Sequence, residues 1–291
     1  MRNSPIGSRT ALDIERRVQR ILSDLGNPAP PLDLGAVREL LSLDLKYYSS
    51  SDVGLFEEIV HRLTIAGKQV IREPTRLIDV IRRADLRALW IPDSRQILVS
   101  GELPPPKQRW GEAHEIGHSI LPWHESVTHG DPKHTLSFAC SAQIEAEANY
   151  VAGRLLFLNY QFEEEVRSCT VNFDRISELS KSFGNTLTST LWRAVESSTR
   201  PAFGLLSQHP RDPTLSLDLR YFIRSPDFIA RFDTVTELEI FGHIHSTCRR
   251  GGGPIGDSEL VLDDDDGHPR PFRVETFFNG HDALTLGVQL A

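Results

Sequence analysis

The chain of 291 residues lacks the features of a membrane protein or of a disulfide-stabilised protein. Its three cysteines, Cys140, Cys169 and Cys248, are too few and too widely spaced for a disulfide framework or a CxxC pair. No apolar run approaches the ~20 residues that a membrane helix needs, and the polar start has no signal-peptide core. We therefore expect a cytoplasmic protein that does not bind membranes.

The chain also lacks an excess of basic residues. It carries 32 Lys and Arg against 40 Asp and Glu, for a formal net charge of -8. Proteins that bind phosphate backbones concentrate positive charge, so we do not expect this chain to bind nucleic acid directly. With 39% hydrophobic and 25% charged residues, the composition is that of a globular protein, and the length suggests roughly two domains.

The apolar pattern predicts an α+β protein with helices first and strands last. Helical spacing predicts helices at 11–25, 34–41, 55–71, 75–84, 107–121, 140–158 and, as one or two helices, 173–198. Runs rich in β-formers predict strands at 43–49, a hairpin at 88–92 and 95–100, and five strands after Pro201, at 202–208, 219–224, 259–262, 271–278 and 283–290. We expect a loose N-terminus at 1–10 and a mainly helical domain with a small sheet at 11–200. A smaller β-rich domain of unassigned role follows at 201–291.

The segment His114-Glu115-Ile116-Gly117-His118 is an HExxH motif within the predicted helix at 107–121. Residues four apart lie about 40° apart around a helix, so both imidazoles can bind one metal ion. Glu115 is offset and can reach a metal-bound water without being a ligand. Zinc held by two His and one Glu keeps a fourth position for that water and lowers the water pKa to ~7. The motif therefore predicts a zinc hydrolase with Glu115 as general base.

A third zinc ligand is expected from the helix at 140–158, where Glu145 and Glu147 are the candidates. At about 100° per residue, Glu145 falls on a side of small apolar residues that could pack closely on the HExxH helix. Glu147 falls nearer Arg154 and the polar side. We therefore expect Glu145 as the ligand and keep Glu147 as the alternative. Asn149, one turn beyond Glu145, either holds a zinc histidine through its other ring nitrogen or makes a local helix bond.

Three further histidines, His124, His129 and His134, lie between the two predicted helices, and Cys140 begins the second one. No pair among them has an established ligand spacing, so we expect a polar loop and neither a second metal site nor a transition-state donor near the first. The acidic run at 263–266 is interpreted as a solvated turn. The only methionine is Met1, which excludes the Met-turn of metzincins.

The segments RWGEAHEIGHSILPWH (109–124) and IEAEANYVAGRLLFL (144–158) resemble the ImmA/IrrE family of zinc metallo-endopeptidases. The likeness covers roughly 11–200. It implies a gluzincin-like site with His114, His118 and Glu145 on one zinc ion per chain and Glu115 as general base. It also implies limited cleavage of a protein substrate, such as a transcriptional repressor, in a stress response. Departures are an apparent helical insertion at 52–84, the β-rich tail and the lack of a recognisable helix-turn-helix.

Two functions follow from these motifs. In the leading hypothesis the chain is an endopeptidase, and the RQILVS strand (95–100) is the sheet edge along which an extended substrate pairs. In the alternative the chain is a non-catalytic regulatory or protein-binding module that retains a structural zinc. A fourth protein ligand, such as Cys140 or His134, would favour this alternative. The presence of Glu115 favours the enzyme, because a structural site does not need that carboxylate.

Overall fold

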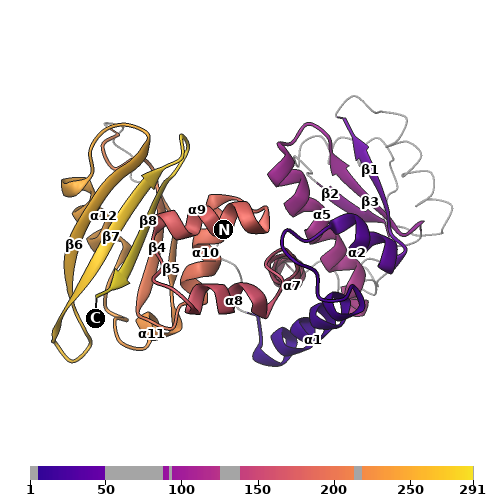
Figure 1. The fold of residues 1–291 in the computed structure, drawn as a ribbon, viewed down its shortest axis with the longest axis horizontal. Coiled ribbons are helices and arrows are strands. Elements are labelled where there is room, and N and C mark those ends of the chain that lie inside the picture. The colour runs from indigo at the N-terminus through magenta and orange to yellow at the C-terminus, as the bar shows by residue number, and fades with distance from the viewer. Residues whose placement is uncertain (1–5, 50–87, 92–93, 125–137, 213–217, 291) are drawn as a thin grey trace. The chain divides into compact units, whose positions relative to one another are not determined.

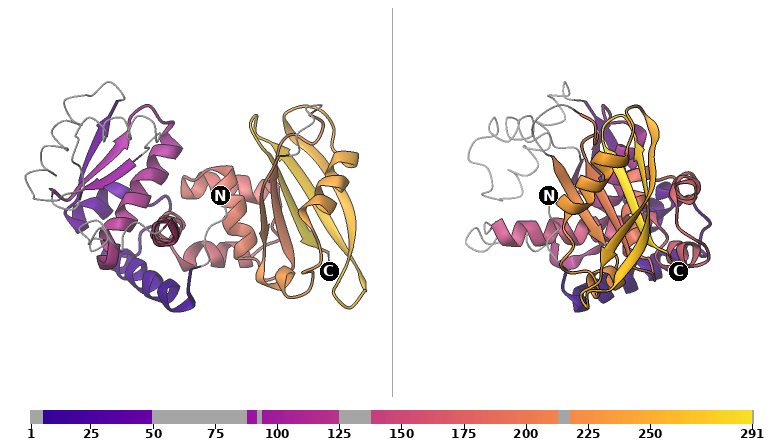
Figure 2. Two further views of the ribbon diagram at one scale, coloured as in Figure 1. Left: turned by 180° about the vertical axis from the view of Figure 1, so that it is seen from behind. Right: turned by 90° about the vertical axis from the view of Figure 1, so that its left-hand side faces the viewer.

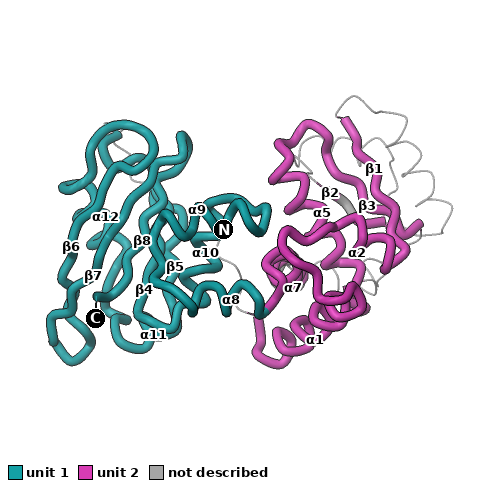
Figure 3. The backbone as a smooth tube through the Cα atoms, viewed as in Figure 1, with its two compact units in different colours: residues 1–2, 160–291 teal, residues 3–159 magenta. Residues whose placement is uncertain are grey.

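In the computed structural model, the described part of the chain comprises residues 6–49, 88–91, 94–124, 138–212 and 218–290. It divides into two units, residues 3–159 and residues 160–291 together with 1–2 (Figure 3). Helices and two sheets are present, which confirms the α+β class (Figure 1). The helices expected at 55–71 and 75–84, and His129 and His134, lie outside the described residues.

The two units divide between Asn159 and Tyr160, whereas the sequence places a domain boundary near residue 200. Three helices therefore lie in the unit that contains the C-terminal sheet: α8 (Tyr160–Arg167), α9 (Phe173–Phe183) and α10 (Leu187–Glu196). The sequence predicts α9 and α10 within 173–198, but it does not predict α8. Sequence periodicity marks α9 and α10 but does not show which sheet they cover. At the N-terminus, α1 (Ser8–Asp24) begins before the expected residue 11.

The sheet of the N-terminal unit has three described strands: β1 (Asp44–Tyr48), β2 (Ala88–Ile91) and β3 (Gln96–Ser100). Their order is β1-β3-β2, with β3 parallel to β1 and antiparallel to β2, so the predicted hairpin is present. β3 is buried and paired on both sides. The prediction that RQILVS offers a free edge to substrate is therefore wrong, and β1 and β2 are the edges of this sheet among the described strands.

The N-terminal unit also contains four described helices: α1, α2 (Leu34–Leu41), α5 (Pro105–Ile120) and α7 (Phe138–Leu156). Asp33 caps α2 by accepting a hydrogen bond from the Gly35 N–H at 2.8 Å, as its position before the apolar run predicts. Prolines occupy the first turn of α5, where their missing N–H costs little. α5 packs on β2 and β3 and also on α7, and α1 packs on α7. The HExxH helix is thus held between the sheet and α7.

The contact between α5 and α7 is close enough to require a glycine. A Cβ added to Gly117 would lie 2.9 Å from the carbonyl oxygen of Ala148 and 3.1 Å from the Cβ of Val151. Ala148 and Ala152 on the facing side of α7 are themselves small and fully buried. The backbones of the two helices therefore approach each other at the turn that carries His118.

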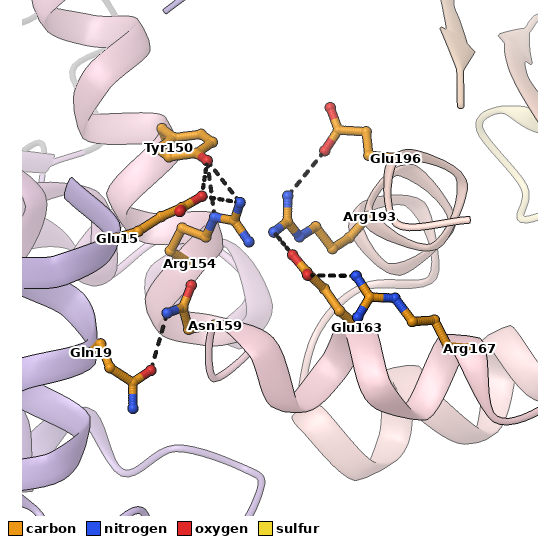
Figure 4. Close-up of polar contacts among 9 residues, drawn as sticks. All are labelled: Glu15, Gln19, Tyr150, Arg154, Asn159, Glu163, Arg167, Arg193 and Glu196. Carbon is orange, nitrogen blue, oxygen red and sulfur yellow. Dashed lines mark hydrogen bonds and ion pairs between the residues drawn. The ribbon is translucent and has the colours of Figure 1, made fainter. Parts of the chain in front are cut away.

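A buried ionic group ties α1 to α7 (Figure 4). Arg154 of α7 forms an ion pair with Glu15 of α1, and the Tyr150 hydroxyl donates to the same carboxylate at 2.6 Å. Asn159 donates to Gln19, one turn after Glu15 on α1, at 3.1 Å. Because a charge removed from water needs a partner, these bonds fix the position of α1 on α7.

The C-terminal unit is built on a five-stranded antiparallel sheet of order β5-β4-β8-β7-β6. Its strands are β4 (Ala202–Ser207), β5 (Leu219–Arg224), β6 (Gly253–Asp263), β7 (Pro269–Phe278) and β8 (Ala283–Gln289). α10 packs on β4, β5 and β8, while α11 (Pro226–Ile229) and α12 (Glu237–Thr247) lie on the other face (Figure 2). Helices on both faces explain why β4 is buried throughout and has no polar side chain before Ser207.

Aromatic packing fills the face of this sheet that α11 and α12 cover. Phe203, Phe228, Phe232 and Phe272 are fully buried, with neighbouring ring centroids 5.1 to 5.9 Å apart.

An ion pair between Arg193 and Glu163, at 3.0 Å, joins α10 to α8 (Figure 4). Among the described helices of both units, none is long and apolar enough to cross a membrane.

We expect Gly117→Ala to destabilise the protein, because the new methyl group would meet backbone atoms of α7 that cannot move away cheaply. Overpacking costs about 1–3 kcal/mol, whereas the gain in helix propensity is roughly 0.5–1 kcal/mol. Gly153→Ala on α7 is the matched control, since a Cβ there meets nothing within 4 Å. Urea unfolding of both variants measures the difference. Equal stabilisation by both substitutions would contradict the close packing of α5 on α7.

Candidate metal centre

His114, His118 and Glu145 come together where α5 packs on α7. The two Nε2 atoms are 3.2 Å apart, on successive turns of α5. From α7, Glu145 places Oε2 3.2 Å from His114 Nε2 and Oε1 3.7 Å from His118 Nε2. The three residues that the sequence predicts as zinc ligands are therefore adjacent in the structure, on the elements that the motif spacing predicts.

The donor set fits a tetrahedral metal ion. Zinc bonds of about 2.0–2.1 Å place neighbouring ligand atoms roughly 3.3 Å apart, close to the observed separations of 3.2 Å. Among the described residues, three side chains, His114, His118 and Glu145, make up this cluster. Two imidazole nitrogens that face each other at this distance need a proton or a cation between them. The cluster could hold a metal ion with three protein donors.

Asn149 orients the first of these histidines. Its Oδ1 lies 3.0 Å from His114 Nδ1 and is a hydrogen-bond acceptor, so the ring proton is on Nδ1 and the Nε2 lone pair is free. Asn149 lies one turn after Glu145 on α7, so the same helix supplies a carboxylate and the group that orients a histidine. Of the two roles considered for Asn149, the structure contains the bond to the histidine.

The sequence analysis places Glu145 on the packed side of its helix and Glu147 nearer the polar side, but the burial of the two side chains is the reverse. The Glu145 side chain is 56% exposed, whereas that of Glu147 is 3% exposed. Helical geometry separates the two faces of α7 correctly, but both faces are covered to some extent, since α1 and α5 each pack on this helix. The half-exposed Glu145 lies beside the histidines, and its position leaves the cluster open to solvent.

Glu147 is engaged in other bonds. Its Oε2 accepts from Trp123 Nε1 at 2.6 Å and from His124 Nε2 at 3.0 Å, and its Oε1 accepts from Gln143 at 3.0 Å. Burial alone would raise the pKa of Glu147, but these three hydrogen bonds outweigh it, so the pKa is lowered and the group is a carboxylate. The alternative ligand of the sequence analysis therefore contacts a neighbouring set of side chains.

His124 is the site residue that sequence reasoning missed. The expectation of a polar loop is wrong for this residue, which is buried and lies 3.0 Å, Nδ1 to Nδ1, from His118. α5 ends at Ile120, and the chain then makes one further turn, in which the His124 N–H donates to the Leu121 carbonyl at 2.9 Å. The sequence does offer one signal, because Trp123 and His124 directly follow Pro122 in a segment that is otherwise polar.

Glu115 lies on the sheet side of α5 and outside the donor cluster. It is buried, and the backbone N–H of Trp90 in β2 donates to its carboxylate. Burial raises its pKa to about 7, although the charge of His114 and the Trp90 hydrogen bond act in the opposite direction. A cation at the histidines would lower this pKa by the same coulombic mechanism that His114 already exerts.

The histidines differ in their affinity for a proton. Burial, followed by repulsion from His114, lowers the pKa of His118, which keeps it neutral. Burial also lowers the pKa of His114, but its hydrogen bond to Glu145 and the nearby carboxylate charges outweigh this, so its pKa is raised. A metal ion would compete with a proton for these ring nitrogens.

A second group of possible metal donors, Asp264, Asp266 and His268, lies in the turn between β6 and β7. Asp264 accepts from the His268 N–H at 2.8 Å and from Arg270 Nε at 2.9 Å. These bonds, the backbone one first, lower the Asp264 pKa to about 2. A guanidinium at 2.9 Å opposes binding of a cation, so the acidic run serves as a turn.

An HExxH helix that packs on a second helix with a nearby glutamate is the arrangement of a metallopeptidase-like domain. Residues 66–193 match the family model of peptidase family M78, the IrrE N-terminal-like domain. Over residues 66–193, this match confirms the resemblance that the sequence analysis describes.

A solved structure of a Mycobacterium tuberculosis transcriptional regulator is similar to the chain, with a TM-score of 0.52 and 13% sequence identity. The similarity covers 95% of this chain and 76% of that one. At this identity it shows a common fold. No curated protein matches the chain significantly.

We expect Glu145→Ala to weaken zinc binding far more than Glu147→Gln. Zinc binding free energies of about 10–16 kcal/mol, shared among four ligands, place roughly 3 kcal/mol, or about 100-fold in affinity, on each one. Glu147→Gln keeps hydrogen-bonding capacity at a residue that does not contact the cluster. Competition with a chromophoric chelator measures both affinities. A larger loss for Glu147→Gln than for Glu145→Ala would reverse the choice between the two glutamates.

Proposed function

We propose that the protein is a zinc-dependent endopeptidase that makes limited cuts in a protein substrate. In this proposal His114, His118 and Glu145 hold one zinc ion per chain, and Glu115 is the general base. The observation that carries the proposal is the convergence of two Nε2 atoms and a carboxylate within 3.2 to 3.7 Å of one another. A residue of type and position suited to proton transfer, Glu115, follows His114 directly on the same helix.

When bound, zinc would polarise the scissile carbonyl and make the attacking water more acidic. The chain supplies the proton transfer. Glu115 takes the proton of the attacking water and passes it to the leaving amine. Burial raises the pKa of Glu115, which offsets the lowering that a bound cation would cause and suits a group that must both take and release a proton. The Trp90 N–H holds the carboxylate in place before substrate arrives.

The position of β2 supports a binding strand for an extended substrate. β2 is an edge of the three-stranded sheet among the described strands, and α5 packs directly on it. A peptide that pairs with this edge by backbone hydrogen bonds would lie along the strand whose Trp90 N–H contacts Glu115. In the proposal, β2 takes the role that the sequence analysis gave to the buried strand β3.

The alternative function, a regulatory or binding module with a structural zinc, requires a fourth protein ligand. The described residues provide three donors, and the half-exposed Glu145 favours an open fourth position. The side chains of Cys140 and His134, which were considered as fourth ligands, lie outside the described residues. The exposure of the cluster and the presence of Glu115 support the enzyme.

The remaining parts of the proposal concern the setting. The substrate is a protein, such as a transcriptional repressor in a stress response, and the reaction takes place in the cytoplasm. A net charge of -8 supports a protein that does not bind nucleic acid directly.

We expect Glu115→Gln to retain zinc and to lose peptidase activity by at least about 100-fold, because general base catalysis contributes about 10²–10⁴-fold. Cells that produce wild-type protein, Glu115→Gln or Glu164→Gln are compared by mass spectrometry of protein N-termini. Glu164 is exposed on α8, so Glu164→Gln removes the same charge away from the cluster.

New N-termini should appear with the wild type and Glu164→Gln and be missing with Glu115→Gln. The same new N-termini in all three cultures would contradict the role of Glu115. The wild-type culture is grown under several different stress conditions. If no new N-terminus appears in it under any of them, this result would contradict the endopeptidase itself.

A further inference from the structure

A buried chain of hydrogen bonds runs from α7 to the back of His118. It begins at the Glu147 carboxylate, whose Oε2 lies 3.0 Å from His124 Nε2. It continues from His124 Nδ1 to His118 Nδ1, also at 3.0 Å. Glu147 and His124 are both almost completely buried, so water does not substitute freely for either bond. The chain ends at the histidine nitrogen opposite the one that faces the metal cluster.

The donors and acceptors in this chain can be assigned in one consistent direction. The Glu147 carboxylate accepts, so the His124 proton is on Nε2. A neutral His124 then has an unprotonated Nδ1, which accepts from His118. The His118 proton is therefore on Nδ1, and its Nε2 lone pair is directed at the cluster. Two ring nitrogens 3.0 Å apart form a hydrogen bond when one of them carries the proton, so one Nδ1 donates and the other accepts.

The first link of the chain is held by several groups. Trp123 Nε1 and Gln143 Nε2 also donate to the Glu147 carboxylate, at 2.6 and 3.0 Å. The guanidinium of Arg17 lies 5.3 Å from the centre of the Trp123 ring, over its face. Contacts with α1 and α7 thus hold the turn after Pro122 and, with it, the direction of the His124 ring.

The same design serves the other histidine by a shorter route. Asn149 accepts directly from His114 Nδ1, whereas Glu147 acts on His118 through His124. Glu145, Glu147 and Asn149 lie at alternate positions within two turns of α7. One helix therefore supplies a cluster carboxylate and the acceptors that orient both histidines of α5.

We propose that His124, held by Glu147, is a positioning residue that fixes the ring orientation and tautomer of His118 for metal binding. The inference rests on the proposed function only in that His118 holds the metal ion. It gives Glu147, the alternative ligand of the sequence analysis, a separate role in the site. Groups that orient zinc-binding histidines typically contribute 10–100-fold to metal affinity.

The test compares two substitutions in the full-length protein, with zinc alone as the probe. His124→Phe keeps a flat ring but removes the acceptor, and we expect zinc affinity to fall about 10–100-fold. His124→Asn keeps an oxygen near the position of Nδ1, and we expect it to restore most of the lost affinity. The absorption spectrum of the cobalt-loaded protein should change with His124→Phe and remain close to that of the wild type with His124→Asn.

Zinc affinity of His124→Phe equal to that of the wild type would overturn the inference. So would equal losses in both variants, because the effect would then come from packing and not from the acceptor. The wild type gives an independent measurement if a variant does not fold. Nitrogen NMR of ¹⁵N-histidine-labelled, zinc-loaded protein should show His124 protonated on Nε2 and His118 on Nδ1. A His124 proton on Nδ1 would overturn the inference.

These results are distinguishable from a failure of the proposed function. Wild-type protein that binds zinc with the expected tautomers but cleaves nothing would leave the positioning role intact and remove the endopeptidase. Wild-type protein that binds no zinc would overturn both.

Discussion

The close approach of α5 and α7 at Gly117 is the constraint on which the site depends. With no Cβ at this position, α5 lies against the backbone of Ala148. His114 and His118 on one helix then meet Glu145 and Asn149 on the other. A wider separation would leave the two imidazoles with each other but without the carboxylate. The sheet holds the opposite side of α5, so the helix cannot rotate to compensate.

The two sides of α5 have different electrostatic environments, and this separates two chemical roles. On the α7 side, two imidazoles and a half-exposed carboxylate make a set of donors that could hold a cation. On the sheet side, Glu115 is buried against β2 and has a raised pKa. In the proposed function, adjacent residues on one helix thus provide a metal donor and a proton acceptor. The one-residue offset between His114 and Glu115 in HExxH has this physical meaning.

Much of the site could be predicted because its residues lie within regular helices. Spacing along a helix fixes direction, so the pairing of His114 with His118, and the one-turn relation of Glu145 to Asn149, follow from periodicity. The burial of Glu147 does not follow from periodicity, because a helical wheel separates two faces but does not show what packs on each. His124 lies beyond the end of α5, after Pro122, where the periodicity of α5 no longer determines the direction of a side chain.

The fold shows the same limit. The strands of the C-terminal sheet are marked by local composition, and all five were found, although β6 begins at Gly253, well before the predicted residue 259. The place of β3 between β1 and β2 depends on a pairing with β1, from a distant segment of the chain, and local composition does not encode it. Helix α12 was missed, since its sequence ELEIFGHIHST mixes helix formers with β-branched residues. The grouping of α8 to α10 with this sheet is likewise a property of packing.

X-ray absorption spectroscopy at the zinc edge of the zinc-loaded wild-type protein tests the central claim most directly. The account predicts only nitrogen and oxygen neighbours at about 2.0–2.1 Å, with the outer-shell scattering of two imidazoles. A sulfur neighbour at about 2.3 Å would show that a cysteine completes the shell. Outer-shell scattering from three or four imidazoles would likewise show a closed protein site. Either result would contradict an open site made by His114, His118 and Glu145.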